Sequence, residues 1–349
     1  MPSTPQRRYV PMLDVVRISA IVAVVGIHCL APAATAESAP WALVVFRSML
    51  NAAVPVFIMI SGALNLAPVA MRNGAWPFLR SRFARLIPAT IVWTLVYGVV
   101  INGVVLGRDL TAERLGKEAL MGDQSPQLYF LWLIMGLSII TPVLGSFVAH
   151  SKARAWAATG VSLAWGLSVY LAPNAFEAVG QPTGVISGAV LTYWIFYVGH
   201  YLAGHVAFAH PVRRRLAPAV LALGIALLVA LGVCGGLGIE NEGWGKLVSG
   251  NYRSPLNVGA SFALVAGLLA VSREWEVSDR VQGVLRRLGD ASFGVFLCHF
   301  VVLIGVRLLV PGLDSSGTLA CVGAWVLVLG LSWAVSLVAA RIPYVRAVF

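Results

Sequence analysis

Residues 11–31 read PMLDVVRISAIVAVVGIHCLA, and they give the clearest indication of the architecture of this chain. It is long and apolar enough to cross a bilayer as one helix, yet it contains Asp14, Arg17 and His28. An ionisable side chain at the centre of a membrane helix costs about 2.5–3.5 kcal/mol on insertion scales. Three such groups imply a polar cavity, partner groups, or both. The stretch therefore predicts a membrane helix with a functional polar face.

The spacing of these three residues places them on one side of the helix. At 100° per residue, Arg17 and His28 point in directions only about 20° apart, and Asp14 lies about 40° further round. At 1.5 Å per residue, Arg17 and His28 are separated by roughly 16 Å along the axis. This polar face therefore contacts one long ligand or two separate groups.

The composition extends the membrane assignment to the whole chain. Of 349 residues, 59% are hydrophobic and only 11% are charged, and the mean hydropathy is +0.84. Such a chain is too apolar for a soluble globular protein. We expect an all-α transmembrane bundle of about ten spans, forming a single domain over residues 1–349 without a soluble domain. The predicted spans are 11–31, 42–66, 86–106, 127–148, 155–172, 187–207, 216–237, 255–272, 290–310 and 318–339.

The distribution of Lys and Arg predicts the orientation, because short cytoplasmic loops are enriched in both. With the N-terminus inside, the outer loops keep only Arg108, Arg114, Lys117, Lys246 and Arg253. The inner segments carry Arg7, Arg8, Arg72, Arg80, Arg82, Arg85, Lys152, Arg154, Arg213, Arg214, Arg215, Arg273, Arg280, Arg286, Arg287, Arg341 and Arg346. Both termini are therefore predicted to be cytoplasmic.

The net charge of +11 indicates topology and contact with anionic lipid, so we expect no nucleic-acid partner. The N-terminal segment imitates a cleavable signal peptide, but Asp14 and Arg17 interrupt its apolar run, which predicts an uncleaved span. The four cysteines show neither a CxxC pair nor metal-ligand spacing. We expect no structural disulfide and no metal site.

Three further segments contain candidate functional residues. In NAAVPVFIMISGAL (51–64), Pro55 and the pair Ser61-Gly62 predict a kink or break in the second span. Arg82 and Arg85 lie three residues apart at a membrane boundary, a spacing that suits phosphate binding, although cytoplasmic anchoring explains them equally well. His299 lies midway along the ninth span, where a buried imidazole needs a hydrogen-bond partner.

Taken in order, six segments resemble the acyltransferase-3 family of integral membrane acyltransferases. They are LDVVRISAIVAVVGIHCL (13–30), VPVFIMISGAL (54–64), RFARLIPAT (82–90), QLYFLWLIMGLSIITPVL (127–144), TYWIFYVGHYLAG (192–204) and SFGVFLCHF (292–300). The first has the family's Arg and His separated by ten residues. Two positions depart from the family pattern, with Gln127 where a His is often found and Phe296 where a Tyr is common.

The resemblance implies transfer of an acyl group, commonly acetyl, from cytoplasmic acyl-CoA to a hydroxyl of a sugar or polysaccharide outside the membrane. It also implies residence in the bacterial cytoplasmic (inner) membrane, in contact with lipid and with possible glycan-assembly partners or further copies of the chain. The candidate binding residues for the CoA phosphates are Arg17, Arg82 and Arg85. The candidate catalytic residues are His28, as the base, with Ser61 and His299. Asp14 is expected to pair with Arg17.

Several alternatives stay open at this point. The acyl group could be transferred directly, or an acyl-His28 intermediate could form first. Ser61 could be a nucleophile, an oxyanion donor or a packing residue. A transporter or flippase without covalent chemistry, or a sensor or assembly subunit, would also place charges in membrane helices. The acyltransferase interpretation predicts a water-accessible passage from the guanidinium groups to His28.

Overall fold

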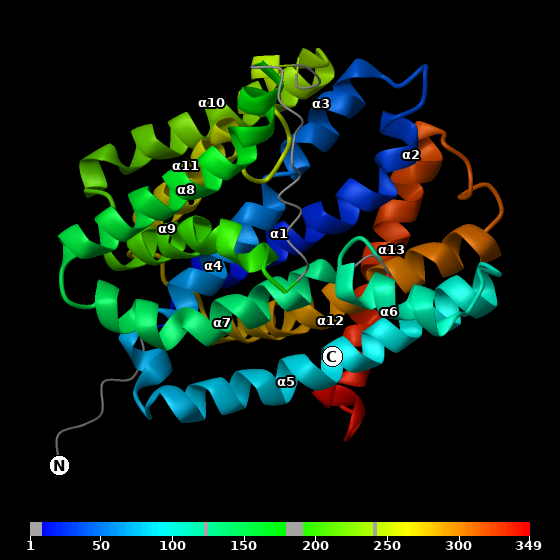
Figure 1. Ribbon diagram of the computed structural model, residues 1–349, viewed down its shortest axis with the longest axis horizontal. Helices are drawn as coiled ribbons and strands as arrows, with labels where there is room; N and C mark the ends of the chain where they lie inside the picture. Colours follow the sequence, from blue (N-terminus) through cyan, green and yellow to red (C-terminus); the bar gives the residue numbers. More distant parts are fainter. Residues whose placement is uncertain (1–8, 122–124, 179–190, 240–242) are drawn as a thin grey trace.

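The computed structural model describes residues 9–121, 125–178, 191–239 and 243–349 (Figure 1). The regular structure in these ranges is helical throughout and contains no strand, which confirms the all-α prediction. Arg7 and Arg8, which the sequence assigns to the cytoplasmic side, lie outside the described residues. The first residues of the predicted span 187–207 do so too.

Thirteen α-helices are described, and they follow one another along the chain. They are α1 (Pro11–Cys29), α2 (Ala31–Ala34), α3 (Trp41–Leu50), α4 (Ala53–Asn65), α5 (Ala75–Leu95), α6 (Ala112–Met121), α7 (Tyr129–Val148), α8 (Lys152–Ala178), α9 (Val198–Ala209), α10 (Ala217–Gly236), α11 (Pro255–Val271), α12 (Asp279–Leu309) and α13 (Thr318–Ala339). The π-helical segment η2 (Val96–Val105) extends α5, and the 3-10 turn η3 (Tyr193–Tyr197) precedes α9.

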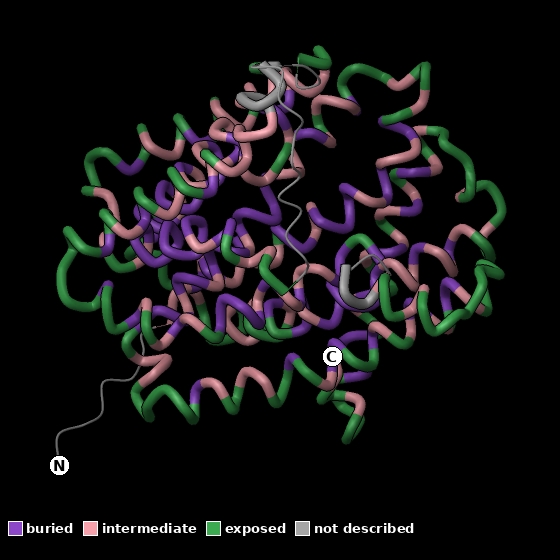
Figure 2. The backbone as a smooth tube through the Cα atoms, viewed as in Figure 1, coloured by how far each residue is buried: buried purple, intermediate pink, exposed green. Residues whose placement is uncertain are grey.

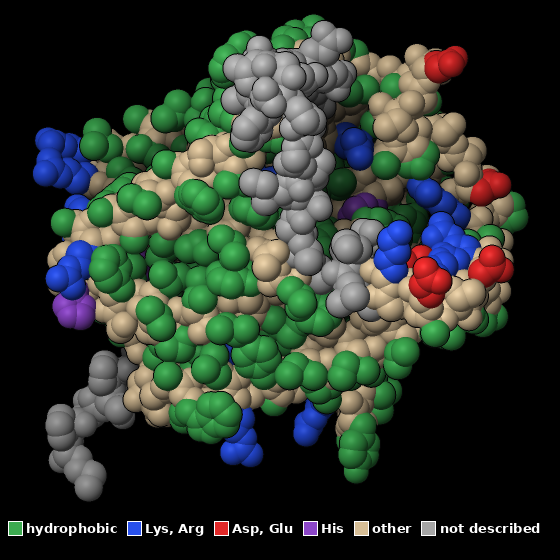
Figure 3. Space-filling model, in the orientation of Figure 1, with side chains coloured by type: hydrophobic (Ala, Val, Ile, Leu, Met, Phe, Trp, Pro, Cys, Tyr) green, Lys and Arg blue, Asp and Glu red, His purple; other side chains and the backbone are tan. Residues whose placement is uncertain are grey.

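Eight helical segments within the described ranges are long and apolar enough to cross a membrane. The other two predicted spans, 187–207 and 255–272, appear as the shorter helices α9 and α11. The count of ten full-length spans is therefore not confirmed, and the orientation of the termini stays a prediction. Hydrophobic side chains cover much of the face shown in Figure 3, while charged side chains gather at its margins. This distribution fits a protein embedded in lipid.

Helix α1 lies in the middle of the bundle and packs against α4, α12 and α13 (Figure 1). Val16, Ile21 and Val25 on α1 are buried in the main hydrophobic core. Figure 2 shows buried residues concentrated along these central helices. The polar face predicted from the sequence thus lies inside protein, where ionisable side chains can find partners.

Helices α4 and α9 touch backbone to backbone through two glycines. A Cβ atom on Gly62 would lie 1.8 Å from the carbonyl oxygen of Tyr201, and one on Gly204 would lie 1.7 Å from that of Met59. No side chain larger than a hydrogen fits at either position. This close contact, rather than a helix break, explains Gly62 and fixes the helix that carries Ser61.

The helix break in the second span lies earlier than the sequence suggested. Helix α3 ends at Leu50 and α4 begins at Ala53, whereas α4 continues without interruption through Ser61 and Gly62. Pro55 lies in the first turn of α4, where a missing N–H removes no helical hydrogen bond. Pro55 therefore marks the start of a helix, and the predicted break in this span lies before it and not at Ser61-Gly62.

Candidate functional site

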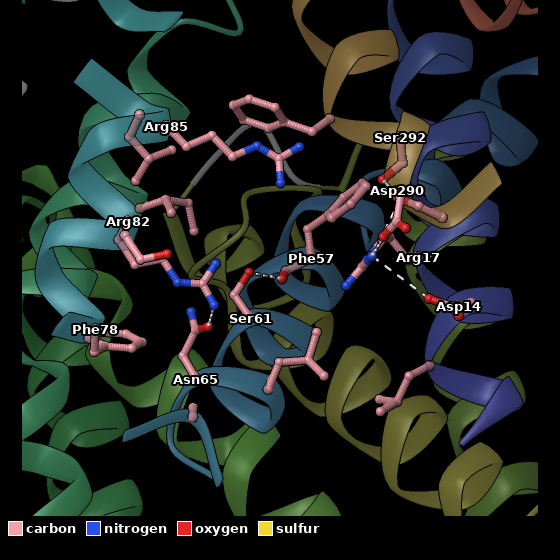
Figure 4. Close-up of a pocket in the computed structure, with 18 of the residues that line it drawn as sticks. Asp14, Arg17, Phe57, Ser61, Asn65, Phe78, Arg82, Arg85, Asp290 and Ser292 are labelled. Atoms are coloured by element: carbon pink, nitrogen blue, oxygen red, sulfur yellow. Dashed lines mark hydrogen bonds and ion pairs between the residues drawn. The ribbon is translucent and has the colours of Figure 1, made fainter. Parts of the chain in front are cut away.

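A cavity of about 1030 Å³ opens between α1, α4, α5, α7 and α12. Its wall includes Arg17 from α1, Ser61 from α4, and Arg82 and Arg85 from α5. Figure 4 shows Arg82 and Ser61 on one side of this space and Arg17, with the carboxylates near it, on the other. The fold thus brings together three arginines and one serine that are widely separated in the sequence.

Arg82 and Arg85 line the cavity, and their guanidinium groups contact an amide and aromatic rings. The guanidinium of Arg82 donates to the side-chain oxygen of Asn65 and lies 5.5 Å from the ring centroid of Phe78. The guanidinium of Arg85 lies 4.7 Å from the ring centroid of Phe293. In the described part of the chain, neither forms an ion pair. Both charges are therefore available to an anionic ligand.

Arg17 differs, because two carboxylates flank its guanidinium. Its Nη1 atom lies 3.7 Å from an oxygen of Asp14 and 3.8 Å from one of Asp290, and it donates to the carbonyl oxygen of Gly289 at 3.4 Å. The predicted pairing of Asp14 with Arg17 is confirmed. An anionic ligand at Arg17 must compete with both carboxylates, so Arg82 and Arg85 supply the stronger attraction.

Tyr9 completes the arrangement around Asp14. Its hydroxyl donates to a carboxylate oxygen of Asp14 at 2.8 Å, and its ring lies 4.5 Å from the guanidinium of Arg286. Burial, followed by the hydrogen bond to Asp14, raises the pKa of the Tyr9 hydroxyl well above its ordinary value. The hydroxyl therefore stays protonated and fixes the orientation of Asp14.

Ser61 faces the same cavity as the arginines. Its hydroxyl donates to the carbonyl oxygen of Phe57, one turn earlier in α4, at 3.0 Å. This is the ordinary bond of a serine inside a helix. Neither His28 nor His299 lies in the cavity wall with Ser61. The structure thus separates the candidate serine from the two candidate histidines.

His28 and His299 lie together beyond the far end of the cavity. Their ring centroids are 5.6 Å apart, and the ring of Phe300 contacts both, at 4.7 Å from His28 and 5.4 Å from His299. His28 is half-buried in the last turn of α1, and His299 is fully buried on α12. The sequence analysis named both imidazoles as catalytic candidates, and the fold places them side by side.

The hydrogen bonds of His299 fix its tautomer. Its Nδ1 atom lies 2.7 Å from the carbonyl oxygen of Phe296 and 3.2 Å from that of Val295. Carbonyl oxygens only accept hydrogen bonds, so Nδ1 carries the proton in the neutral ring and Nε2 keeps its lone pair. That Nε2 atom is buried and has no partner among the described residues. It is a proton acceptor close to His28.

Aromatic side chains separate the cavity from the histidine pair. The end of the cavity nearer the histidines is lined by Phe57, Phe130 and Phe296. The ring of Phe130 lies 5.2 Å from that of Phe296, which in turn lies 6.1 Å from His299. These rings lie between the arginines and the imidazoles, and the passage from the arginines to His28 stays a prediction.

A family model described as an acyltransferase domain matches residues 10–341, which is nearly the whole chain. The chain belongs to the acyltransferase-3 family. No curated protein and no solved structure matches it. Family membership and the apolar helices together make this protein an integral membrane acyltransferase.

Four polar residues of this acyltransferase lie around the candidate site, although the sequence analysis did not identify them as candidates. Asp290 and Asn65 contact Arg17 and Arg82. Arg47 and Arg307 donate to backbone carbonyls on either side of His28. Arg47 and Arg307 carried a signal, since a charge inside a span is costly. Asp290 and Asn65 carried none, because polar residues near span ends are ordinary. Among the described residues, no group of His, Cys, Asp and Glu could hold a metal ion.

Proposed function

We propose that this acyltransferase moves an acyl group, in the simplest case acetyl, from cytoplasmic acyl-CoA to a hydroxyl of a sugar or polysaccharide on the outer side of the bacterial inner membrane. One observation carries the proposal. A cationic cavity and a pair of imidazoles lie at opposite ends of the same central helix, roughly 16 Å apart along its axis. An acyl-CoA has its phosphates at one end and its thioester at the other, joined by a long arm.

The donor would bind with its phosphates on Arg82 and Arg85. Charge-assisted hydrogen bonds from guanidinium groups are about twice as strong as neutral ones, and their geometry matches a phosphate. Arg17 would join them if the phosphate displaced Asp290, whose side chain is 84% exposed and whose hold on Arg17 is weak. The end of the cavity nearer the histidines is apolar, with Phe57, Phe130 and Phe296. It would surround the arm that joins the phosphates of acyl-CoA to its thioester.

The chemistry would take place at His28, beyond the phenylalanine rings. A nitrogen of His28 takes the proton of the acceptor hydroxyl while the hydroxyl oxygen attacks the thioester carbonyl carbon. The tetrahedral intermediate collapses, the carbon–sulfur bond breaks, and the CoA thiolate leaves and takes up the proton. The products are an ester on the acceptor and free CoA. The Nε2 atom of His299 has no hydrogen-bond partner among the described residues, and it would accept a hydrogen bond from the other nitrogen of His28.

The test compares surface glycans from a strain that lacks the gene and carries either the wild-type chain or His28→Ala. We expect mass spectrometry to find acyl esters with the wild-type chain and none with His28→Ala, at equal membrane expression. His150→Ala is the matched control, because His150 is exposed and bonds only to the carbonyl oxygen of Ser146. Unchanged acylation by His28→Ala would refute the proposal. It would leave transport without covalent chemistry as the better explanation.

An experiment with purified protein distinguishes direct transfer from an acyl-enzyme. Purified wild-type chain is mixed with radiolabelled acetyl-CoA without acceptor and analysed by intact-protein mass spectrometry. Direct transfer predicts no mass increase. An added acetyl group that disappears in His28→Ala would instead show that His28 forms a covalent intermediate.

A further inference from the structure

The last turn of α1, which carries His28, ends where a proline interrupts the helix. Pro32 has no N–H, and it lies four residues after His28, so it cannot donate to the His28 carbonyl. Helix α1 accordingly ends at Cys29, with Leu30 as its C-cap. Carbonyl oxygens at such an end need donors from outside the helix. In this fold, two of the donors are arginine side chains.

Arg47 and Arg307 bond to the carbonyls directly before and after His28. The Nε atom of Arg47, on α3, donates to the Ile27 oxygen at 3.2 Å. The Nη2 atom of Arg307, on α12, donates to the Cys29 oxygen at 3.3 Å. Two helices that are far apart in the sequence thus hold the backbone on both sides of one imidazole.

These two arginines are costly to keep where they are. Apart from Arg17, they are the only Lys or Arg residues inside the predicted spans. Cations do favour the C-terminal end of a helix, but that effect contributes only about 0.3–1 kcal/mol, less than the cost of placing a charge at membrane depth. Helix capping alone therefore does not account for two guanidinium groups at the end of α1.

Arg307 also links the positions of the two histidines. It lies on α12, eight residues after His299, so the helix that carries one imidazole also holds the turn that carries the other. Arg47 holds the same turn from α3 on another side. Without these bonds, the end of α1 could fray or rotate, and the contact between His28 and His299 would lose its fixed geometry.

We infer that Arg47 and Arg307 are positioning residues, which hold the last turn of α1 so that the imidazole of His28 stays against His299. This inference rests on the proposed function, in which His28 is the base. A displacement of about 1 Å in a reacting group can cost about 100-fold in rate. Loss of either arginine should therefore lower kcat while leaving the binding of acyl-CoA, at the other end of α1, unchanged.

The experiment measures CoA release from acetyl-CoA by the full chain in proteoliposomes, with unacylated glycan extracted from the deletion strain as acceptor. For Arg47→Gln and Arg307→Gln, we expect kcat to fall about 10-fold to 100-fold, with an unchanged KM for acetyl-CoA. Arg47→Lys and Arg307→Lys should recover part of the loss, because the ammonium keeps the charge and one donor. Arg214→Gln is the control, since Arg214 forms an exposed ion pair with Glu274, and it should behave as wild type.

If the wild-type chain transfers no acyl group, the proposed function is refuted, but the positioning role can still be tested. A second measurement does so. The ¹⁵N resonances of the His28 ring are compared between the wild type, Arg307→Gln and Arg214→Gln. We expect them to shift or broaden only in Arg307→Gln. Resonances that match the wild type, or a kcat that is unchanged in both glutamine variants, would overturn the positioning role.

Discussion

The imidazole of His299 lies 5.6 Å from that of His28, with its Nδ1 atom bonded to backbone carbonyls and its Nε2 atom without a partner among the described residues. The tautomer follows from the carbonyls, which cannot donate. His299 is therefore built to accept a hydrogen bond, as the orienting carboxylate does in a catalytic triad. The following predictions begin from this pair.

His299→Ala should lower kcat without weakening donor binding. Because His299 orients the base rather than taking the substrate proton, we expect a loss of about 10-fold to 100-fold, smaller than that of His28→Ala. The double variant should be no slower than His28→Ala alone, since residues that act as a unit are not additive. The assay is CoA release in proteoliposomes. Independent, multiplicative losses would show that the two imidazoles act separately.

Arg82→Ala and Arg85→Ala should each weaken acyl-CoA binding. One charge-assisted contact contributes about 1.5–3 kcal/mol, so we expect the Kd to rise by about 10-fold to 100-fold, measured by calorimetry in nanodiscs. Acetyl-pantetheine lacks the nucleotide phosphates, and its affinity should not change in either variant. Arg80→Ala is the control, because Arg80 is exposed and lies outside the cavity wall. An equal loss of affinity for both ligands would contradict phosphate binding.

Asp290→Asn should strengthen acyl-CoA binding. The substitution removes one of two carboxylates that neutralise Arg17, although the Asp290 side chain is 84% exposed and solvent screens the pair. An exposed pair contributes about 0.2–1 kcal/mol, so we expect the Kd to fall by no more than about fivefold. The gain should disappear in the double variant with Arg17→Ala. A gain that persists there would mean that Asp290 acts on the ligand and not through Arg17.

Phe296→Ala should allow water and donor to meet without acceptor. The ring of Phe296 separates the cavity from His299, and its loss opens the inner end of the cavity towards the histidines. We expect the ratio of acetyl-CoA hydrolysis to acyl transfer to rise several-fold. Phe293→Ala is the control, because Phe293 packs on Arg85 nearer the mouth. An unchanged ratio in Phe296→Ala would show that this ring does not close the passage.

Gly62→Ala should destabilise the fold without a direct effect on chemistry. The added Cβ would lie 1.8 Å from the Tyr201 carbonyl oxygen, so α4 and α9 must separate. Overpacking of this kind costs about 1–3 kcal/mol, which thermal unfolding in detergent should record as a lower Tm. Gly283→Ala is the matched control, since its Cβ meets nothing within 4 Å. Equal Tm values for the two variants would contradict the close contact.

The structure explains why some residues were visible in the sequence and others were not. Asp14, Arg17, His28 and His299 stood out because an ionisable group in an apolar run is costly. Asp290 and Asn65 did not, because their importance comes from contacts with Arg17 on α1 and Arg82 on α5, over 273 and 17 residues of separation. The position of the break in the second span was also missed. A proline looks the same in sequence whether it interrupts a helix or begins one.

The amino-acid sequence alone was enough to identify a helical membrane protein, to find the polar face of α1 and to show which family the chain resembles. Those properties depend on hydrophobicity and on local spacing. Hydrophobicity decides whether a helix can cross a bilayer, and spacing fixes the side of the helix on which a residue lies. The distances among His28, His299 and Ser61 came from the tertiary structure, which places His28 beside His299 and Ser61 with the arginines in the cavity wall. These contacts join residues on different helices, and their distances depend on how whole helices pack, which no local pattern encodes.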